Sequence, residues 1–333
     1  MLSYIFQRLA YTAVLLVLIS ITSFVIIQLP PGDYLSSYIR QLEASGQPVD
    51  QSEIEAMKRQ YGLDQPVAVQ YFKWVGGMLE GDFGRSLQWS RPVSDLIGER
   101  MFLTVVMNVA TLIFTYLIAI AIGVYSATHQ YSAADYGFTV LGFIGLAIPN
   151  FLLALILMVF FHNTFGLSIG GLFSPEYASA PWGWGKMVDL LFHLPIPMII
   201  IGTSGAAGLI RVMRGALLDE LRKQYVVTAR SKGLSERRLL FKYPVRVAVN
   251  PVISTVGWVL PGLVSGGAIT AIVLSLPTVG PLLFRALLSE DMYLAGTLIL
   301  LLSFLTIIGT LVSDILLVML DPRIRMERSS SAH

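Results

Sequence analysis

The side chains best placed to do chemistry in this sequence are ten basic residues gathered between positions 211 and 246. Three acidic residues accompany them, so this segment has a net charge of +7, whereas the whole 333-residue chain has a net charge of only +2. Apolar residues recur at helical spacing on both sides of Gly233. They are Leu217, Leu218, Leu221 and Tyr225 before the glycine, and Leu239, Leu240 and Tyr243 after it. The pattern predicts two short amphipathic helices joined at a glycine.

The ends of the second predicted helix carry typical signals. Ser235 is placed as its N-cap, Glu236 lies in the first turn, where the helix dipole favours an acid, and Pro244 ends it. Basic charge in such a loop keeps it on the cytoplasmic side and attracts anionic lipid. Ten basic residues exceed what orientation needs, so a helix that docks into a groove on a soluble protein is the second interpretation.

Motifs for catalysis or cofactor binding are missing from the sequence. The chain has no cysteine, no G-x-x-x-x-G-K-[ST], no G-x-S-x-G and no H-E-x-x-H, and Gly185-Lys186 is followed by Met187. We therefore expect no catalytic residue, no metal ligand and no bound cofactor in this chain.

Polar groups within the apolar runs are few. Asp314 lies about 9 Å before Asp321 along a helix, so it either reaches the cytoplasmic interface or pairs with Arg211 or Arg214. We favour a structural ion pair over a proton relay. Five small or polar residues are candidates for lining a path across the membrane, although close helix packing explains each more simply. They are Asn108, Asn150, Ser204, Ser265 and Gly266.

Lipid-embedded helices must position these residues. The chain is 55% hydrophobic and 13% charged, against about 25% charged in soluble domains, which excludes a soluble enzyme, a disordered tail and a nucleic-acid binder. Apolar runs that could cross about 30 Å of hydrocarbon occur at 9–29, 101–128, 136–161, 190–210, about 250–273 and 292–320, with a bent or re-entrant stretch after 273. We predict an all-α polytopic membrane protein with six transmembrane helices.

Basic residues in the short loops indicate the orientation. With a cytoplasmic N-terminus, the inner segments carry 14 basic residues and the short outer loops carry two, so both termini are expected in the cytoplasm. The expected organisation is an N-terminal transmembrane helix retained in the mature chain at 1–29, an extracytoplasmic segment at 30–100, a core domain at 101–320 that contains five transmembrane helices and the loop 211–246, and a cytoplasmic tail at 321–333. Composition favours a small lid for 30–100, with a helix at 51–61, over a docking surface for an outer partner.

The loop Tyr225–Arg238, YVVTARSKGLSERR, closely resembles the cytoplasmic loop of ABC-importer permease subunits of the dipeptide, oligopeptide and nickel type. It is similar to their E-A-A-x-x-x-G signature, with Val227, Thr228 and Ala229 in place of E-A-A, as is usual in the peptide branch. The resemblance covers 1–326. Further matches are Gln7-Arg8-Leu9, Gly62-Leu63-Asp64-Gln65-Pro66, Gln70-Tyr71, Gly81-Asp82-Phe83-Gly84-Arg85-Ser86, Arg91-Pro92-Val93 and Leu320-Asp321-Pro322-Arg323-Ile324-Arg325.

This resemblance implies a type I ABC importer permease fold in the bacterial cytoplasmic membrane. It implies a second homologous permease subunit, two ABC ATPase subunits that bind ATP and Mg²⁺, and an extracytoplasmic solute-binding protein as partners, and no nucleic acid. The ATPase-coupling residues would be Tyr225, Thr228, Ala229, Arg230, Lys232, Gly233, Leu234, Glu236, Arg237 and Arg238.

The resemblance leaves the solute open. Such permeases take di- and oligopeptides, nickel complexes or opines, and the segments 29–34 and 128–132 are similar to members linked to oligosaccharide uptake. Two other classes compete with an ATP-driven importer. A self-sufficient secondary transporter would need internal repeats and more intramembrane ionisable residues, and a membrane scaffold would use the basic loop only to bind lipid.

Overall fold

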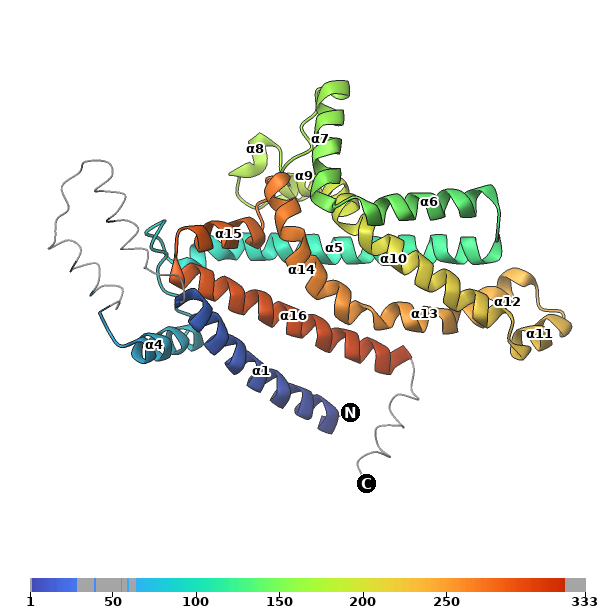
Figure 1. Ribbon diagram of the computed structural model, residues 1–333, viewed down its shortest axis with the longest axis horizontal. Helices are drawn as coiled ribbons and strands as arrows, with labels where there is room; N and C mark the ends of the chain where they lie inside the picture. Colours follow the sequence, from blue (N-terminus) through green and yellow to red (C-terminus); the bar gives the residue numbers. More distant parts are fainter. Residues whose placement is uncertain (1, 29–38, 40–54, 56–58, 60–63, 321–333) are drawn as a thin grey trace. The chain divides into compact units, whose positions relative to one another are not determined.

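The computed structural model describes residues 2–28, 39, 55, 59 and 64–320 of the chain (Figure 1). Within these residues the secondary structure is helical, apart from one isolated antiparallel bridge between Arg85 and Pro92. The helix expected at 51–61, most of the segment between 30 and 63, and the tail 321–333 lie outside the described residues.

The chain divides into two compact units. The first comprises residues up to Thr104 together with Thr278–Ile307, and the second comprises Val105–Pro277 and the residues from Ile308 onward. The first unit contains α1 (Leu2–Gln28), α4 (Val67–Leu79), α15 (Val279–Leu288), the beginning of α5 (Val93–Thr128) and most of α16 (Met292–Leu320).

The second unit contains the remainder of α5 and nine further helices. In chain order they are α6 (Ala133–Ala147), α7 (Asn150–Phe165), α8 (Pro175–Ala178), α9 (Trp184–His193), α10 (Pro195–Leu221), α11 (Gln224–Ser231), α12 (Glu236–Lys242), α13 (Pro244–Ser254) and α14 (Val256–Val273).

The prediction of six transmembrane helices is not confirmed. Three helices in the described residues are long and apolar enough to cross a membrane, namely α5, α10 and the part of α16 from Met292 to Val312. A fourth crossing is obtained if α6 and α7 are counted together. Helix α1 is 27 residues long, of which Ala10–Ile26 counts as an apolar helix below the length of a crossing segment.

The segment 136–161 is not one straight helix, as the prediction of a single span assumed. It consists of α6 and α7, which meet at an angle of 105° (Figure 1). Pro149 explains the break, because a proline disfavours helical geometry in the residue before it. Ile148 is accordingly extended, with φ −91° and ψ 120°, and α7 starts directly after the proline.

Two other expected spans are also interrupted. The run 190–210 is divided between α9 and α10, and α10 begins at Pro195, where a proline costs no helical hydrogen bond. The run 250–273 is divided between α13 and α14 at Thr255. Apolar composition therefore located these helices, whereas the prolines set several of their ends.

The core of the second unit holds α5, α10 and α13 together. Met213 and Leu217 of α10 are fully buried there with Val252 of α13. Gly123 of α5 allows the close approach, since a Cβ at this position would lie 2.6 Å from the Cβ of Met213. The two helices that flank the loop 222–243 are thus fixed to one another by packing.

Candidate functional site

The basic loop forms two short helices, as the sequence predicts. Helix α11 ends at Ser231 and α12 begins at Glu236, and both lie beyond the adjoining ends of α10 and α13 (Figure 1). The expected common helical face that includes Tyr225 is wrong, because α10 ends at Leu221 and Tyr225 belongs to α11. Ser235 occupies the N-cap position of α12 but makes no capping hydrogen bond through its side chain.

A small apolar core holds α11 against α12. Val226 and Leu239 are fully buried and Ala229 is nearly so, with Leu234 and Tyr243 packed around them. The burial of one face of each helix leaves the opposite faces in solvent. The loop is therefore a compact unit with its own core rather than an extended linker.

An ion pair joins the two helices across the turn. Arg230 Nε donates to Glu236 Oε1 at 2.6 Å, and Arg230 Nη2 donates to Oε2 at 3.1 Å. This bidentate hydrogen bond lowers the pKa of the Glu236 carboxyl and raises that of the Arg230 guanidinium. Both side chains are mostly exposed, so the pair fixes geometry more than it adds stability.

Gly233 makes the turn between the helices. Its φ is +78°, in the left-handed region that glycine adopts without strain, and its N–H donates to the Arg230 carbonyl. A Cβ at this position would meet no atom within 4 Å. The requirement for glycine is therefore conformational and not steric.

The remaining predicted coupling residues line the exposed side of the unit. Tyr225 donates its hydroxyl to Glu220 of α10, and burial together with this contact raises the pKa of the phenol. Thr228 bonds back to the Gln224 carbonyl within α11. Three basic side chains are exposed, at Lys232, Arg237 and Arg238. Together they present positive charge on a fixed helical frame, an arrangement suited to a protein groove.

The five predicted path-lining residues do not form one site. Asn108 of α5 is 9% exposed, and its amide nitrogen finds no partner among the described residues. Asn150 donates to the Ile201 carbonyl of α10, which is a packing role, and Ser204 is half-buried on α10. The Ser265 side chain and the surroundings of Gly266 on α14 are not among the described parts of the chain.

An ion pair between α6 and α10 was not foreseen from the sequence. Arg214 donates to both oxygens of Asp135, at 3.2 Å and 3.0 Å, and the Asp135 side chain is 4% exposed. Arg214 thus pairs with Asp135, and the ion pair expected between Asp314 and Arg211 or Arg214 is not tested, because the Asp314 side chain lies outside the described residues. Ser132 and Asp135 have the spacing of a helix capping box, and the Ser132 hydroxyl accepts a hydrogen bond from the Asp135 N–H. This local spacing can be recognised in the sequence. The ion-pair partner of Asp135 cannot, because Arg214 lies 79 residues further along the chain.

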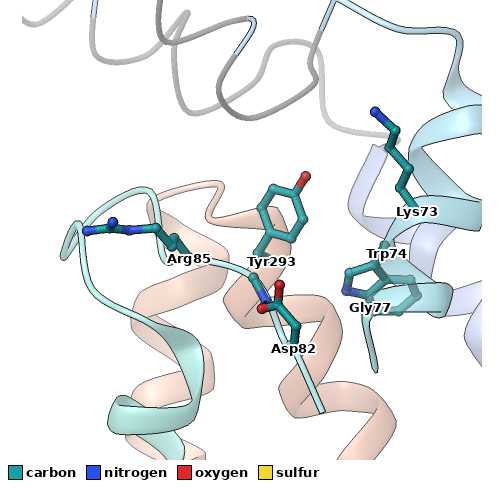
Figure 2. A pocket seen from close by; sticks show the side chains of 7 residues that line it. Lys73, Trp74, Gly77, Asp82, Arg85 and Tyr293 are labelled. Carbon is teal, nitrogen blue, oxygen red and sulfur yellow. Dashed lines mark hydrogen bonds between the residues drawn. The ribbon is translucent and has the colours of Figure 1, made fainter. Parts of the chain in front are cut away.

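The first unit carries a pocket of about 270 Å³ (Figure 2). Figure 2 shows Asp82 and Tyr293 on one side and Lys73 and Trp74 of α4 on the other, whereas Arg85 extends away from them. The Trp74 side chain is buried, and its indole nitrogen has no hydrogen-bond partner among the described residues. The pocket therefore offers an unused N–H donor and an ammonium group opposite a carboxylate.

The segment 81–86, a glycine-rich motif beside this pocket, is held in a fixed conformation. Gly84 has φ +76°, and a Cβ there would lie 2.7 Å from the Tyr293 ring. The fully buried Asp291, which precedes α16, accepts hydrogen bonds from the Ser86 hydroxyl and the Gln88 N–H. The motif is thus anchored to residues more than 200 positions away, and the pocket is largely pre-formed.

Within the described residues, no group of three or more histidine, cysteine, aspartate or glutamate side chains could hold a metal ion. The chemistry available in both regions is hydrogen bonding and charge recognition. The arrangement suits recognition of partners.

Comparison with known proteins matches both parts of the chain. Residues 119–326 match the family described as binding-protein-dependent transport system inner membrane component, and residues 1–108 match the N-terminal part of such membrane components. The chain is 36% identical over 326 residues to the oligopeptide transport system permease protein AppB of Bacillus subtilis, covering 97% of this chain and 99% of that protein. It is 34% identical over 329 residues to a putative peptide permease protein of Brucella ovis, with 98% and 100% covered. A probable peptide ABC transporter permease protein of Sinorhizobium fredii is 28% identical over 323 residues, with 97% and 99% covered.

Proposed function

This chain belongs to the family of binding-protein-dependent transport system inner membrane components, and we propose that it is a permease subunit of an ATP-driven importer of di- or oligopeptides. Peptides are favoured as the solute because the relatives named above are described as peptide or oligopeptide permeases along their whole length. Oligosaccharide uptake by the same machinery is the alternative that a solute-binding assay would distinguish.

The observation that carries the proposal is the compact unit of α11 and α12. It has a buried core, a glycine turn and an exposed basic surface, and it continues into α10 and α13, which pack together in the core of the second unit. A push on α11 or α12 is passed to α10 and α13 because packed helices move as rigid elements. The loop is thus suited to convert closure of a partner ATPase into movement of membrane helices.

The proposed complex contains three kinds of protein partner. This chain pairs with a second homologous permease subunit to form the translocation path, and two ABC ATPase subunits bind ATP and Mg²⁺ below it. An extracytoplasmic solute-binding protein delivers the peptide. The chain itself binds no cofactor and hydrolyses no nucleotide.

The proposed location is the bacterial cytoplasmic membrane, with both termini in the cytoplasm. The excess of basic residues in the segments assigned to the cytoplasm supports this orientation. On this arrangement the pocket at Trp74 faces outward, and we propose it as part of the docking surface for the solute-binding protein. A protease-protection assay on oriented vesicles tests the orientation, since residues 30–100 should be cleaved only from outside.

Charge reversal on α12 tests the coupling surface. The double variant Arg237→Glu, Arg238→Glu reverses two exposed positive charges without altering the core. The amount of ATPase that co-purifies with the permease complex should therefore fall at least about tenfold. The matched control reverses two exposed charges assigned to the outer side, Arg91→Glu with Arg285→Glu, and should retain the ATPase. Undiminished co-purification of the α12 variant would refute the coupling role.

A further inference from the structure

A second cavity, of about 110 Å³, lies within the second unit between α5, α6 and α10. Two arginines of α10, Arg211 and Arg214, stand on its lining. The rest of the lining is mostly apolar or small, and comprises Ser126, Phe138, Thr139, Gly142, Phe143, Ala207 and Ile210. A cavity with guanidinium groups beside aromatic and aliphatic walls suits a ligand that is anionic at one end and apolar at the other.

The two arginines differ in how their charge is used. Arg214 is neutralised by Asp135 through two hydrogen bonds. Arg211 is exposed, and its guanidinium carbon lies 5.6 Å from the centroid of the Phe143 ring. Within the part of the chain that the structure describes, Arg211 forms no ion pair. Among the described residues no carboxylate therefore compensates this charge in the cavity, and Phe143 holds the guanidinium in place by a cation–π contact.

A buried hydroxyl provides an independent indication of a ligand. Ser126 is 1% exposed and lines the cavity, and within the described residues its hydroxyl has no partner at normal hydrogen-bond geometry beyond a weak contact with the Asp135 carboxylate. Buried hydroxyl groups in native proteins are nearly always satisfied by a protein atom, an ordered water or a ligand. A phosphate oxygen in the cavity would accept from Ser126 and from Arg211 together.

The outer surface of α6 next to the cavity is apolar. Tyr136, Val140, Leu141 and Ile144 are between 48% and 63% exposed on this helix. In a membrane protein such a surface contacts lipid tails, because apolar side chains have no polar groups that need water and pack well against hydrocarbon. An amphiphile whose head reached Arg211 would therefore find hydrocarbon contacts along α6.

The position along the chain identifies the leaflet. Arg211 lies ten residues before the end of α10 at Leu221, which leads into the basic α11 and α12. On the proposed topology this end of α10 is cytoplasmic, and the cytoplasmic leaflet is the one rich in anionic lipid. Basic cavities between transmembrane helices on that side are suited to anionic lipid headgroups.

We propose that the cavity between α5, α6 and α10 binds the phosphate of an anionic phospholipid in the cytoplasmic leaflet, with Arg211 and Ser126 as its ligands and the exposed face of α6 as the seat of its acyl chains. The proposal rests on the proposed topology but not on the identity of the solute or on the ATPase contact. Bound lipid would hold the end of α6 beside α10, next to the coupling loop.

The test measures lipid retention on the purified complex. The wild-type complex is delipidated, exchanged into nanodiscs of phosphatidylcholine with or without phosphatidylglycerol, and the lipid that stays bound is quantified by native mass spectrometry. Phosphatidylglycerol should be retained by wild type, and Arg211→Gln should weaken its binding about five- to tenfold, the size expected for one basic residue near a lipid surface. Arg211→Lys, which keeps the charge, should lose less.

The matched control is Arg246→Gln, which removes an exposed arginine from the neighbouring helix α13 outside the cavity. It should leave phosphatidylglycerol binding unchanged, and Ser126→Ala, which conserves the packing volume, should weaken binding in the same direction as Arg211→Gln. Equal retention by wild type and Arg211→Gln, or equal losses in Arg211→Gln and Arg246→Gln, would overturn the proposal. Competition by soluble glycerol phosphate as effective as by the lipid would show a site for free phosphate instead.

These outcomes are separable from the proposed function. ATPase co-purification with the Arg211→Gln variant reports on the coupling loop, and labelling of a single cysteine at position 246 from either side of the membrane reports on the topology. Loss of lipid with the ATPase retained and with position 246 labelled from the cytoplasmic side is the result we expect.

Discussion

Two arginine–carboxylate pairs in the second unit use the same chemistry in different surroundings. Arg230 and Glu236 are six residues apart, and their side chains are 51% and 67% exposed. Arg214 and Asp135 are 79 residues apart, and their side chains are 30% and 4% exposed. Both pairs are bidentate, so the difference between them lies in burial and in the length of chain that each pair closes.

The comparison teaches that one pair shapes a surface whereas the other stabilises a helix packing. An exposed pair contributes little to stability because water already solvates both charges. A buried carboxylate has no such alternative, so the loss of its partner is costly. We therefore expect substitutions at Arg214 to affect the fold, and substitutions at Arg230 to affect coupling to the partner ATPase.

The largest effect is expected from Arg214→Ala. This change leaves the Asp135 carboxylate buried without its cation, which should destabilise the protein by about 3 kcal/mol, the low end for breaking a buried pair. Thermal unfolding in detergent measures the loss, with Arg230→Ala as the matched removal of an exposed arginine. If Arg214→Ala lowers the unfolding temperature no more than Arg230→Ala does, the buried pair does not stabilise the protein more than the exposed pair.

A double change sharpens the same point. Asp135→Asn combined with Arg214→Gln removes both charges, so it should be less destabilising than Arg214→Ala, which leaves one of them uncompensated. If the double variant unfolds at a lower temperature than the single variant, the pair contributes more than mutual neutralisation.

An intermediate effect is expected from Gly233→Val. A β-branched residue at φ +78° costs about 1–2 kcal/mol, and because a Cβ has free space there, the cost falls on the turn and not on packing. We expect ATP hydrolysis by the complex to become uncoupled from peptide uptake while membrane insertion stays normal. Gly215→Val on α10, where a Cβ also has free space, is the control for added bulk. Unchanged peptide uptake in vesicles by the Gly233 variant would exclude the coupling role of this turn.

The smallest effect is expected from Glu236→Gln. The pair with Arg230 lowers the pKa of this carboxyl, so its contribution is present above the usual carboxyl range and is lost only as pH falls through the lowered pKa. The melting temperature should therefore match wild type between about pH 6 and 8, because this exposed pair adds little stability, whereas hydrogen exchange in α11 should become faster. An equal exchange rate in both proteins would show that the apolar core of Val226 and Leu239 alone sets the turn.

Local pattern explains why the coupling unit could be predicted. Its two helices, the turn at Gly233 and the acidic first turn at Glu236 all depend on residues within about 20 positions of one another. Tyr225 was assigned to the wrong helix. Helix α10 ends at Leu221 and Tyr225 belongs to α11, and apolar periodicity alone does not show a break between two helices with similar spacing.

The candidate path residues could not be resolved in this way. Asn108 and Asn150 looked alike as amides in apolar runs. The Asn108 nitrogen is buried without a hydrogen-bond partner among the described residues, whereas Asn150 donates to a neighbouring helix. The difference arises from which helix packs against each residue. Neighbouring helices are chosen by the whole fold, which a polar residue in a span does not reveal.

The sequence by itself determined the helical class, the membrane environment, the two-helix basic loop and the family, because hydrophobicity, glycine at a turn and a long ordered set of motifs act locally or by direct resemblance. Only the tertiary structure decided that Pro149 bends one expected span by 105°, that Asp135 pairs with Arg214, and that Asp291 anchors the Ser86 turn. These contacts join residues brought together by packing, and the energy that selects a partner for a buried charge exists only once the surrounding helices have excluded water.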